Sequence, residues 1–480
     1  MDTTHARRAL LLCACAATFL GIYGWVQNSV LFPRFAEFFP VAREIDTAIR
    51  VLLYAAVALV ANRKPALLDP RTIAAVGIVA IASSTALLYV SVIMESSVLA
   101  VGGVALFELG HIWAVVFFGL ALCLLPTVRH TAIAAAGGTA LSDIIELIIG
   151  ALPLVPGMAT LALLPLGALA LTWGPASHFL AGIQKQPAPS DVEISHPRAF
   201  LKPTHLMFAC ILVFSMASGY GLTFNEIGNA PIQSHLTWML MLALTIAFIV
   251  HRKPGGEDAL FSLSVLFIVA GFLAAPFTFD TESGIANALL RMGRNCVELL
   301  LWMTIAAIGK RNPLAMLTAL CIANAAEALG TLVGAVAGHS MNDLVAAADP
   351  IAPVITDVAL FALIAFLWLK LRTFSFEATI AGIEMPEVPA EAPVREDTFD
   401  ERCKAIGAEH GLTERETEIF TMMAHGRNAS FIEEHFVISR NTVKTHVKRI
   451  YKKLDVHSQQ ELIDLAEGAQ AAEEAAPATR

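Results

Sequence analysis

The sequence predicts an all-α protein in two parts, a bundle of twelve transmembrane helices in two halves of six and a small four-helix helix-turn-helix domain. Three observations lead to this prediction. The 480 residues are 56% hydrophobic and 15% charged, with a mean hydropathy of +0.66, whereas soluble proteins carry about 25% charged residues. Twelve apolar windows fill roughly the first three-quarters of the chain. Near its end stands a strongly basic segment, SRNTVKTHVKRIYKKL, at Ser439–Leu454.

Each apolar window approaches the length of about 20 residues that crosses a bilayer as a helix. The windows of the first half lie at 10–31, 46–62, 72–94, 98–125, 129–150 and 159–180. Those of the second half lie at 204–224, 235–250, 259–279, 287–309, 314–337 and 352–371. A polar connection, QKQPAPSDVEISHPRAFLKP, separates them. We therefore predict a transmembrane part at 1–372, with halves at 1–184 and 203–372.

The two halves also share local sequence. VANRKPALLDP follows the second window and IVHRKPGGEDA the eighth, while GIYGWVQN in the first span pairs with SGYGLTFN in the seventh. FELGHIW and VELLLW occupy the fourth and tenth spans, and DIIE and NAAE the fifth and eleventh. A repeat of six plus six spans in one orientation resembles the major facilitator superfamily, which implies two similar bundles around a central site.

The distribution of basic residues predicts the orientation. Of the 20 Lys and Arg residues up to Arg372, 15 lie at the N-terminus, in the even-numbered connections and after the last span. The other side holds Arg34, Arg43, Arg50, Arg291 and Arg294. The positive-inside rule then places both chain ends in the cytoplasm of a bacterial cell, with the bundle in the inner membrane. We expect Arg291 and Arg294 to anchor the tenth span at the membrane interface.

Ionisable side chains within the spans predict a ligand site, because a charge at the bilayer centre costs at least about 2.5 kcal/mol. Several of them share a helix face at i, i+3. The candidate ligand-binding residues are Tyr23, Asn28, Glu108, His111, Asp143, Glu146, Tyr220, Asn225, Glu298 and Glu327. A net-negative cavity lined by them would suit a cationic or hydroxyl-rich small molecule, or a proton. The alternative is that these groups only bond to one another and hold the helices together.

The composition changes after the last span. Residues 373–407 are rich in Pro, Ala and acidic residues, which predicts a linker. A compact helical domain is expected at 408–467, followed by a disordered tail at 468–480.

Capping signals predict four short helices in this domain. TERE is a capping box formed by Thr413 and Glu416, and Gly426 ends that helix. Asn428 can cap a second helix, Ser439 caps the third, and SQQE opens a fourth helix that ends near Gly468. Four such helices with tight turns are typical of a helix-turn-helix unit.

The third helix has two faces. Its apolar stripe packs on the other helices, with Val443, Val447, Ile450 and Leu454 at i, i+4, i+7 and i+11. The opposite side carries Asn441, Lys444, Thr445, Lys448 and Lys452. Basic groups there attract phosphates, and Asn, Thr and Lys can contact base edges in the major groove of double-stranded DNA. The alternative is a solvated surface or a lipid-headgroup contact.

The segment resembles the LuxR-type DNA-binding domain in LTERETEI, Gly426, Ile432 and ISRNTVKTHVKRIYKKLDV. The resemblance implies operator binding as a homodimer, with the third helix in the major groove and the fourth helix at the dimer contact. By motif position it implies base or backbone contacts for Lys444, Thr445 and Lys448, and phosphate contacts for Arg449 and Lys452.

The second helix departs from the family pattern at two positions. Phe431 stands where an acidic residue is usual, and Glu433 where a small alanine is usual. These departures concern the stability or docking angle of that helix rather than DNA contact.

The chain as a whole resembles the membrane-embedded LuxR-type regulators of bacteria. Two functions follow: a receptor that senses a small molecule in its bundle and regulates transcription, or a secondary transporter with a regulatory DNA-binding domain. The sequence holds no phosphate-binding glycine loop, nucleophile constellation or metal-ligand spacing, and its seven cysteines form no framework. We therefore expect no enzyme activity, no cofactor and no metal.

Overall fold

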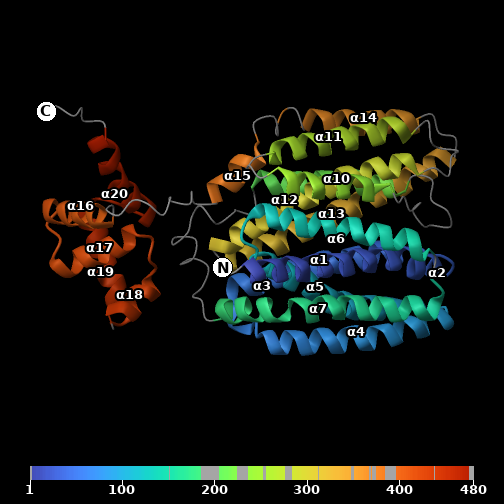
Figure 1. The fold of residues 1–480 in the computed structure, drawn as a ribbon, viewed down its shortest axis with the longest axis horizontal. Coiled ribbons are helices and arrows are strands. Elements are labelled where there is room, and N and C mark those ends of the chain that lie inside the picture. The colour runs from blue at the N-terminus through green and yellow to red at the C-terminus, as the bar shows by residue number, and fades with distance from the viewer. Residues whose placement is uncertain are drawn as a thin grey trace. The chain divides into compact units, whose positions relative to one another are not determined.

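The computed structural model describes residues 3–150, 152–184, 205–223, 236–251, 256–275, 284–311, 313–346, 351–366, 369, 374–383, 396–436 and 438–474. These residues form helices and no strand, as the sequence predicts (Figure 1). The chain divides into two compact units. One holds residues 1–186 and 201–384, and the other includes Met385–Arg480.

The first half of the larger unit contributes six long helices. They are α1 (Thr3–Val26), α3 (Ala42–Arg63), α4 (Pro70–Ile93), α5 (Ser97–Leu122), α6 (Val128–Ile149) and α7 (Leu154–Gln184). Helix α1 continues through a π-helical turn, η1 (Gln27–Leu31), into α2 (Phe32–Phe35), and a 3-10 turn, η2 (Pro65–Leu67), follows α3. The starts of α4, α5 and α6 are capped by Asp69, Ser96 and Thr127, whose side chains accept backbone N–H groups three residues on.

The second half contributes the remaining six spans. They are α9 (Leu206–Leu222), α10 (Thr237–Val250), α11 (Glu257–Ala274), α12 (Ile285–Arg311), α13 (Pro313–Ala346) and α14 (Ile351–Phe366). Among the described residues, a helix thus lies at each of the twelve predicted windows. In Figure 1 these helices run side by side with those of the first half.

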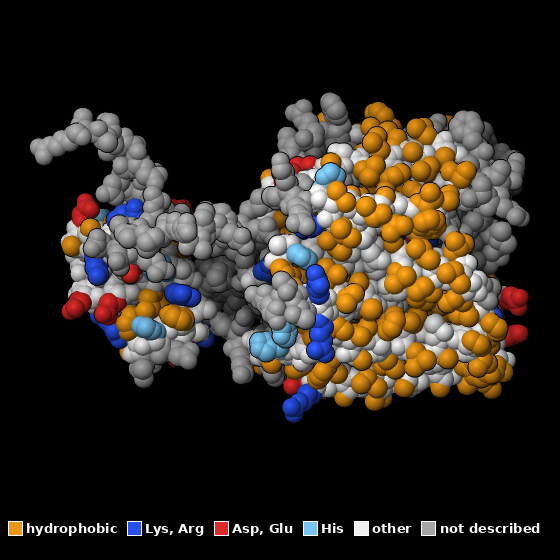
Figure 2. All heavy atoms as spheres, viewed as in Figure 1, with side chains coloured by type: hydrophobic (Ala, Val, Ile, Leu, Met, Phe, Trp, Pro, Cys, Tyr) orange, Lys and Arg blue, Asp and Glu red, His pale blue; other side chains and the backbone are white. Residues whose placement is uncertain are grey.

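The outer surface of the bundle is apolar. Figure 2 shows hydrophobic side chains over its visible flank, with Lys, Arg and His gathered at the end where the N-terminus lies. Val79, Val98 and Leu163 point outward, with 66%, 82% and 66% of their surface exposed. Within the described ranges, seven helices are long and apolar enough to cross a membrane, and α9 and α10 are apolar but shorter. The chain is a multi-pass membrane protein.

The two halves pack in the same way. Helix α1 packs on α6 as α9 packs on α13, and α4 packs on α5 as α11 packs on α12. Across the halves, α3 packs on α13 and α6 on α10, which joins the second span of each half to the fifth span of the other. These two matching contacts between the halves are expected when two similar halves are related by a pseudo-two-fold axis.

Helices α9 and α13 approach closely at glycines. Gly330, Gly334 and Gly338 recur at every fourth residue of α13. A Cβ atom at Gly334 would lie 2.0 Å from the carbonyl oxygen of Met216 on α9. Small residues at this spacing let the two helix backbones come together.

Helix α15 (Phe376–Ile383) packs on α11 and α12. Phe376 and Ile380, one turn apart, are buried, and the Phe376 ring centroid lies 5.3 Å from that of Phe261. The Asp258 carboxylate accepts hydrogen bonds from the Ser375 hydroxyl at 2.6 Å and the Glu377 N–H at 3.2 Å. The predicted linker at 373–407 is therefore wrong here, because this apolar face belongs to the bundle.

The second unit has one core shared by five helices. They are α16 (Glu396–Glu409), α17 (Glu414–Ala424), α18 (Ala429–Phe436), α19 (Arg440–Leu454) and α20 (Gln459–Glu474). The sequence predicts four helices and assigns α16 to the linker, but Cys403 and Ile406 of α16 are buried in this core. Helix α20 also continues past its predicted end at Gly468, because the next residues, Ala-Gln-Ala-Ala-Glu-Glu, favour a helix. The predicted disordered tail is thus wrong as far as Glu474.

Candidate functional site

Helix α19 presents a polar face to solvent. The six residues predicted to contact DNA are all exposed: Asn441, Lys444, Thr445, Lys448, Arg449 and Lys452. On the opposite side Val443, Ile450 and Leu454 are buried against the other helices. The two-faced helix is confirmed, and the roles of its exposed residues in DNA contact remain a prediction.

Both ends of α19 are fixed by local contacts. The Ser439 hydroxyl accepts the Thr442 N–H at 3.2 Å and starts the helix. Asp455 ends it in the left-handed region, with φ at 54°. The Lys453 ammonium donates to the Glu416 carboxylate of α17 at 2.6 Å and to the Gly411 carbonyl at 2.8 Å. These contacts hold the C-terminal end of α19 against the N-terminal end of α17.

Glu416 combines two roles in this contact. It completes the capping box with Thr413, as predicted, and it pairs with Lys453. Burial raises the pKa of Glu416, but the Lys453 ammonium and the bonds from Thr413 outweigh it and lower the pKa from 4.5 to about 2. The ionised carboxylate therefore stabilises the folded domain.

We expect Glu416→Gln to lower the free energy of unfolding of segment 396–480 by about 2 kcal/mol at pH 7, because the ion pair is lost while the cap can remain. The segment can be studied alone, since its core lies within α16–α20. A depressed pKa gives stability that is complete above pH 4.5 and disappears as the pH falls towards 2. Urea unfolding should thus show wild type and variant converging in acid. The control is Glu418→Gln, whose carboxylate is 49% exposed, and equal losses in both variants would refute the assignment.

The unusual residues of α18 lie on its surface or edge. Phe431 is 40% exposed, its ring stacks on His435, and the Arg427 guanidinium lies 4.9 Å from its centroid. Asn428 caps the helix by accepting the Phe431 N–H at 2.8 Å, as predicted. Glu433 is half-buried. Neither residue interrupts α18.

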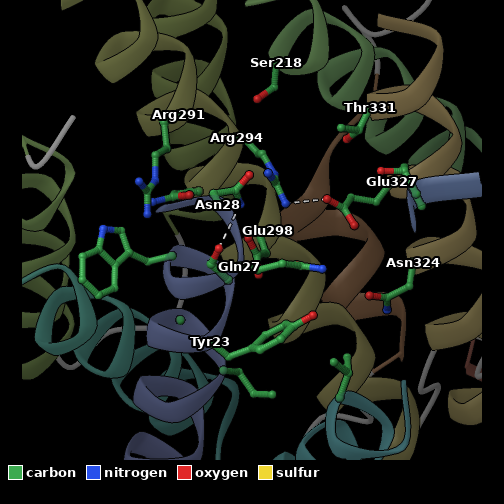
Figure 3. Close-up of a pocket in the computed structure, with 18 of the residues that line it drawn as sticks. Tyr23, Gln27, Asn28, Ser218, Arg291, Arg294, Glu298, Asn324, Glu327 and Thr331 are labelled. Atoms are coloured by element: carbon green, nitrogen blue, oxygen red, sulfur yellow. Dashed lines mark hydrogen bonds and ion pairs between the residues drawn. The ribbon is translucent and has the colours of Figure 1, made fainter. Parts of the chain in front are cut away.

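The bundle encloses a polar cavity of about 350 Å³ between its two halves. Figure 3 shows Tyr23 and Asn28 from the first half facing Arg294, Glu298 and Glu327 from the second. Asn28 lies in η1, and single π-turns within helices often mark functional sites.

An ion-pair network lies on the first-half side of this cavity. The Arg50 guanidinium contacts Asp46 at 2.8 Å and Glu108 at 3.2 Å. Glu108, which is fully buried, also accepts the Tyr23 hydroxyl at 3.4 Å and lies 3.4 Å from the His111 ring nitrogen. Three charged groups thereby satisfy one another at the membrane interior.

Two arginines of α12 reach carboxylates on other helices. Arg294 pairs with Glu327 of α13 at 2.5 Å, drawn as a dashed line in Figure 3. Arg291 crosses to the other half, where it pairs with Asp143 of α6 at 3.2 Å and lies 4.0 Å from Glu146. The predicted role of Arg291 and Arg294 as interfacial anchors is therefore wrong, because their guanidinium groups turn inward towards carboxylates.

The predicted ligand-binding residues divide into three groups. Those that line the cavity are Tyr23, Asn28, His111, Glu298 and Glu327. Glu108, Asp143 and Glu146 are buried behind it and bond to residues that line it. Tyr220 stacks on Phe272 outside the lining, which contradicts its predicted place, and Asn225 lies outside the described residues.

Sequence reasoning missed the partners of these carboxylates. Asp46 and Arg50 share a face of α3 at i, i+4 and form an ion pair, whereas Arg294, four residues before Glu298 on α12, pairs with Glu327 instead. That spacing places each arginine on the same helix face as an intramembrane carboxyl group. Among the described residues, no group of three potential metal ligands occurs.

Residues 410–466 match the family model described as bacterial regulatory proteins, luxR family. This segment is a luxR-type helix-turn-helix domain. The uncharacterized response regulatory protein YgeK of Escherichia coli is 40% identical over 74 residues, which are 15% of this chain and 50% of that protein. The chain thus spans about half the length of this curated relative. The crystal structure of the E. coli fucose:proton symporter FucP covers 78% of this chain and 98% of its own, at 11% identity and a TM-score of 0.45.

Proposed function

We propose that the chain is a one-component transcription regulator of the bacterial inner membrane, in which the bundle senses a small molecule and the luxR-type domain binds DNA as a homodimer. The observation that carries this proposal is the exposed basic face of a luxR-type domain on the same chain as a bundle with a polar cavity. Both chain ends would lie in the cytoplasm, where the domain meets DNA.

The helix order offers a route for the signal. Helix α12 lines the cavity with Arg294 and Glu298, and it also packs against α15, from which the chain continues to the DNA-binding domain. A ligand that favours one arrangement of α12 would also shift α15. Such a ligand acts only through its different affinities for the two states.

A secondary transporter with a regulatory domain is the alternative, favoured by a cavity between two similarly packed halves. The two functions differ in whether ligand crosses the membrane. Transcriptome profiling over a panel of small molecules, with and without the chain, would identify a ligand and its target promoters. Uptake of the same molecule into vesicles would then be measured.

We expect ligand-dependent transcription without uptake. Glu327→Gln should abolish the response, because it leaves Arg294 without its charged partner in the cavity. The matched control is Glu95→Gln, a turn residue between α4 and α5 outside the cavity lining. Uptake that accompanies the response would favour the transporter, and no transcriptional effect under any condition would refute the regulator.

A further inference from the structure

The charged side chains around the cavity differ in whether an opposite charge lies beside them. Arg50, Arg291 and Arg294 each lie within 3.2 Å of at least one carboxylate. An anionic ligand would have to displace one of these partly buried pairs, and breaking such a pair is unfavourable because it leaves the displaced carboxylate without its partner. Of the four arginines that line the cavity, these three therefore do not offer a ready anion site, and the fourth, Arg43, lies over the Phe32 ring.

Glu298 differs from the other carboxyl groups of the cavity. Its side chain is exposed to the cavity, and the Trp302 indole N–H donates to it at 3.4 Å. Among the described residues it forms no ion pair. In Figure 3 it lies in the middle of the lining, between Asn28 and Tyr23. An exposed carboxylate in a low-dielectric site attracts a cation.

Asn295 supplies a second, independent observation. It lines the cavity three residues before Glu298, so both project from one side of α12. Its amide nitrogen is buried, with 9% of the residue exposed, and has no hydrogen-bond partner. A buried donor without a partner is unfavourable. A ligand oxygen placed beside the Glu298 carboxylate would satisfy it.

The neighbouring walls indicate an organic cation rather than a metal ion. Trp302, Trp25 and Tyr23 line the cavity, and aromatic faces stabilise ammonium groups. One free carboxylate is too few ligands for a divalent metal. Resting on the sensing function proposed above, we propose that the ligand is an organic ammonium ion with an oxygen acceptor near its nitrogen, bound by Glu298 and Asn295.

The test uses the full chain in lipid nanodiscs and four probes of one scaffold, with binding measured by calorimetry. The probes are 2-amino-1-phenylethanol, 2-phenylethylamine, 1-phenylethane-1,2-diol and mandelate, which vary charge and hydroxyl separately. We expect the amino alcohol to bind most tightly and mandelate most weakly. Glu298→Gln should weaken amine binding roughly tenfold to hundredfold. Asn295→Leu should remove the preference for the amino alcohol over the plain amine.

Two control variants show whether the charge of Glu298 itself is responsible for amine binding. Glu298→Asp retains the charge and should retain the preference for amines, while Glu95→Gln should bind like the wild-type chain. Mandelate or the diol binding as tightly as the amines would overturn the ligand class, as would unchanged amine affinity in Glu298→Gln. Predicted binding without any transcriptional response would instead refute the regulator and leave the cation site standing.

Discussion

Replacing Lys444 and Lys448 together with alanine should abolish operator binding. Both side chains are exposed on the polar face of α19, one helical turn apart. Each lost contact with a base or phosphate weakens binding by about 1–3 kcal/mol. A dimer loses four such contacts, or at least about 4 kcal/mol, so the affinity should fall by about 1,000-fold or more.

Fluorescence anisotropy on a promoter fragment identified by profiling would measure this loss. The salt dependence gives a second readout, because removing four phosphate contacts lowers the slope of log K against log salt by about 3.6. If the lysines contact bases instead, the slope should change less than the affinity. Lys404→Ala, an exposed lysine on α16, is the matched control. An equal loss in both variants would refute the assignment of α19 as the recognition helix.

Gly334→Leu should prevent the bundle from folding. A side chain there would meet the Met216 carbonyl oxygen at 2.0 Å and the Tyr220 nitrogen at 2.7 Å, both backbone atoms of α9. These atoms cannot move without separating α9 from α13, so the expected destabilisation exceeds about 3 kcal/mol. The measurement is the yield of monodisperse protein in detergent, together with its thermal unfolding.

Gly174→Leu on α7 is the control, because a Cβ atom at Gly174 meets nothing within 4 Å. It should behave as the wild-type protein does, apart from a small change in helix propensity. Normal folding of Gly334→Leu would mean that α9 and α13 do not approach as closely as described.

Much of the fold follows from local sequence. Hydropathy finds the spans because each span must be about 20 apolar residues long, and the caps at Thr413, Asn428 and Ser439 follow from side-chain chemistry. The prediction of a linker rested on the average composition of the segment, which is acidic. That average does not reveal the two helices within it, each of which has an apolar face. Phe376 and Ile380 of α15, and Phe399, Cys403 and Ile406 of α16, repeat at helical spacing and are at least partly buried.

The cavity was predicted only in part, for a different reason. Its carboxyl groups can be recognised singly, since each stands out in an apolar span. Their partners depend on helix packing: Arg291 lies 148 residues from Asp143, and Arg50 lies 58 residues from Glu108. No local pattern connects such pairs, so Arg291 and Arg294 appeared to be interfacial.

The docking of α15 determines where the protein can be divided. A chimera joined directly after Arg372 would remove Phe376 and Ile380 from their places on α11 and α12 and leave Asp258 without Ser375. A junction after Ile383 keeps that contact intact, and one before Glu396 keeps α16 with the DNA-binding domain. The segment between those two residues is therefore the place at which another domain can be joined to this bundle in exchange for the luxR-type domain.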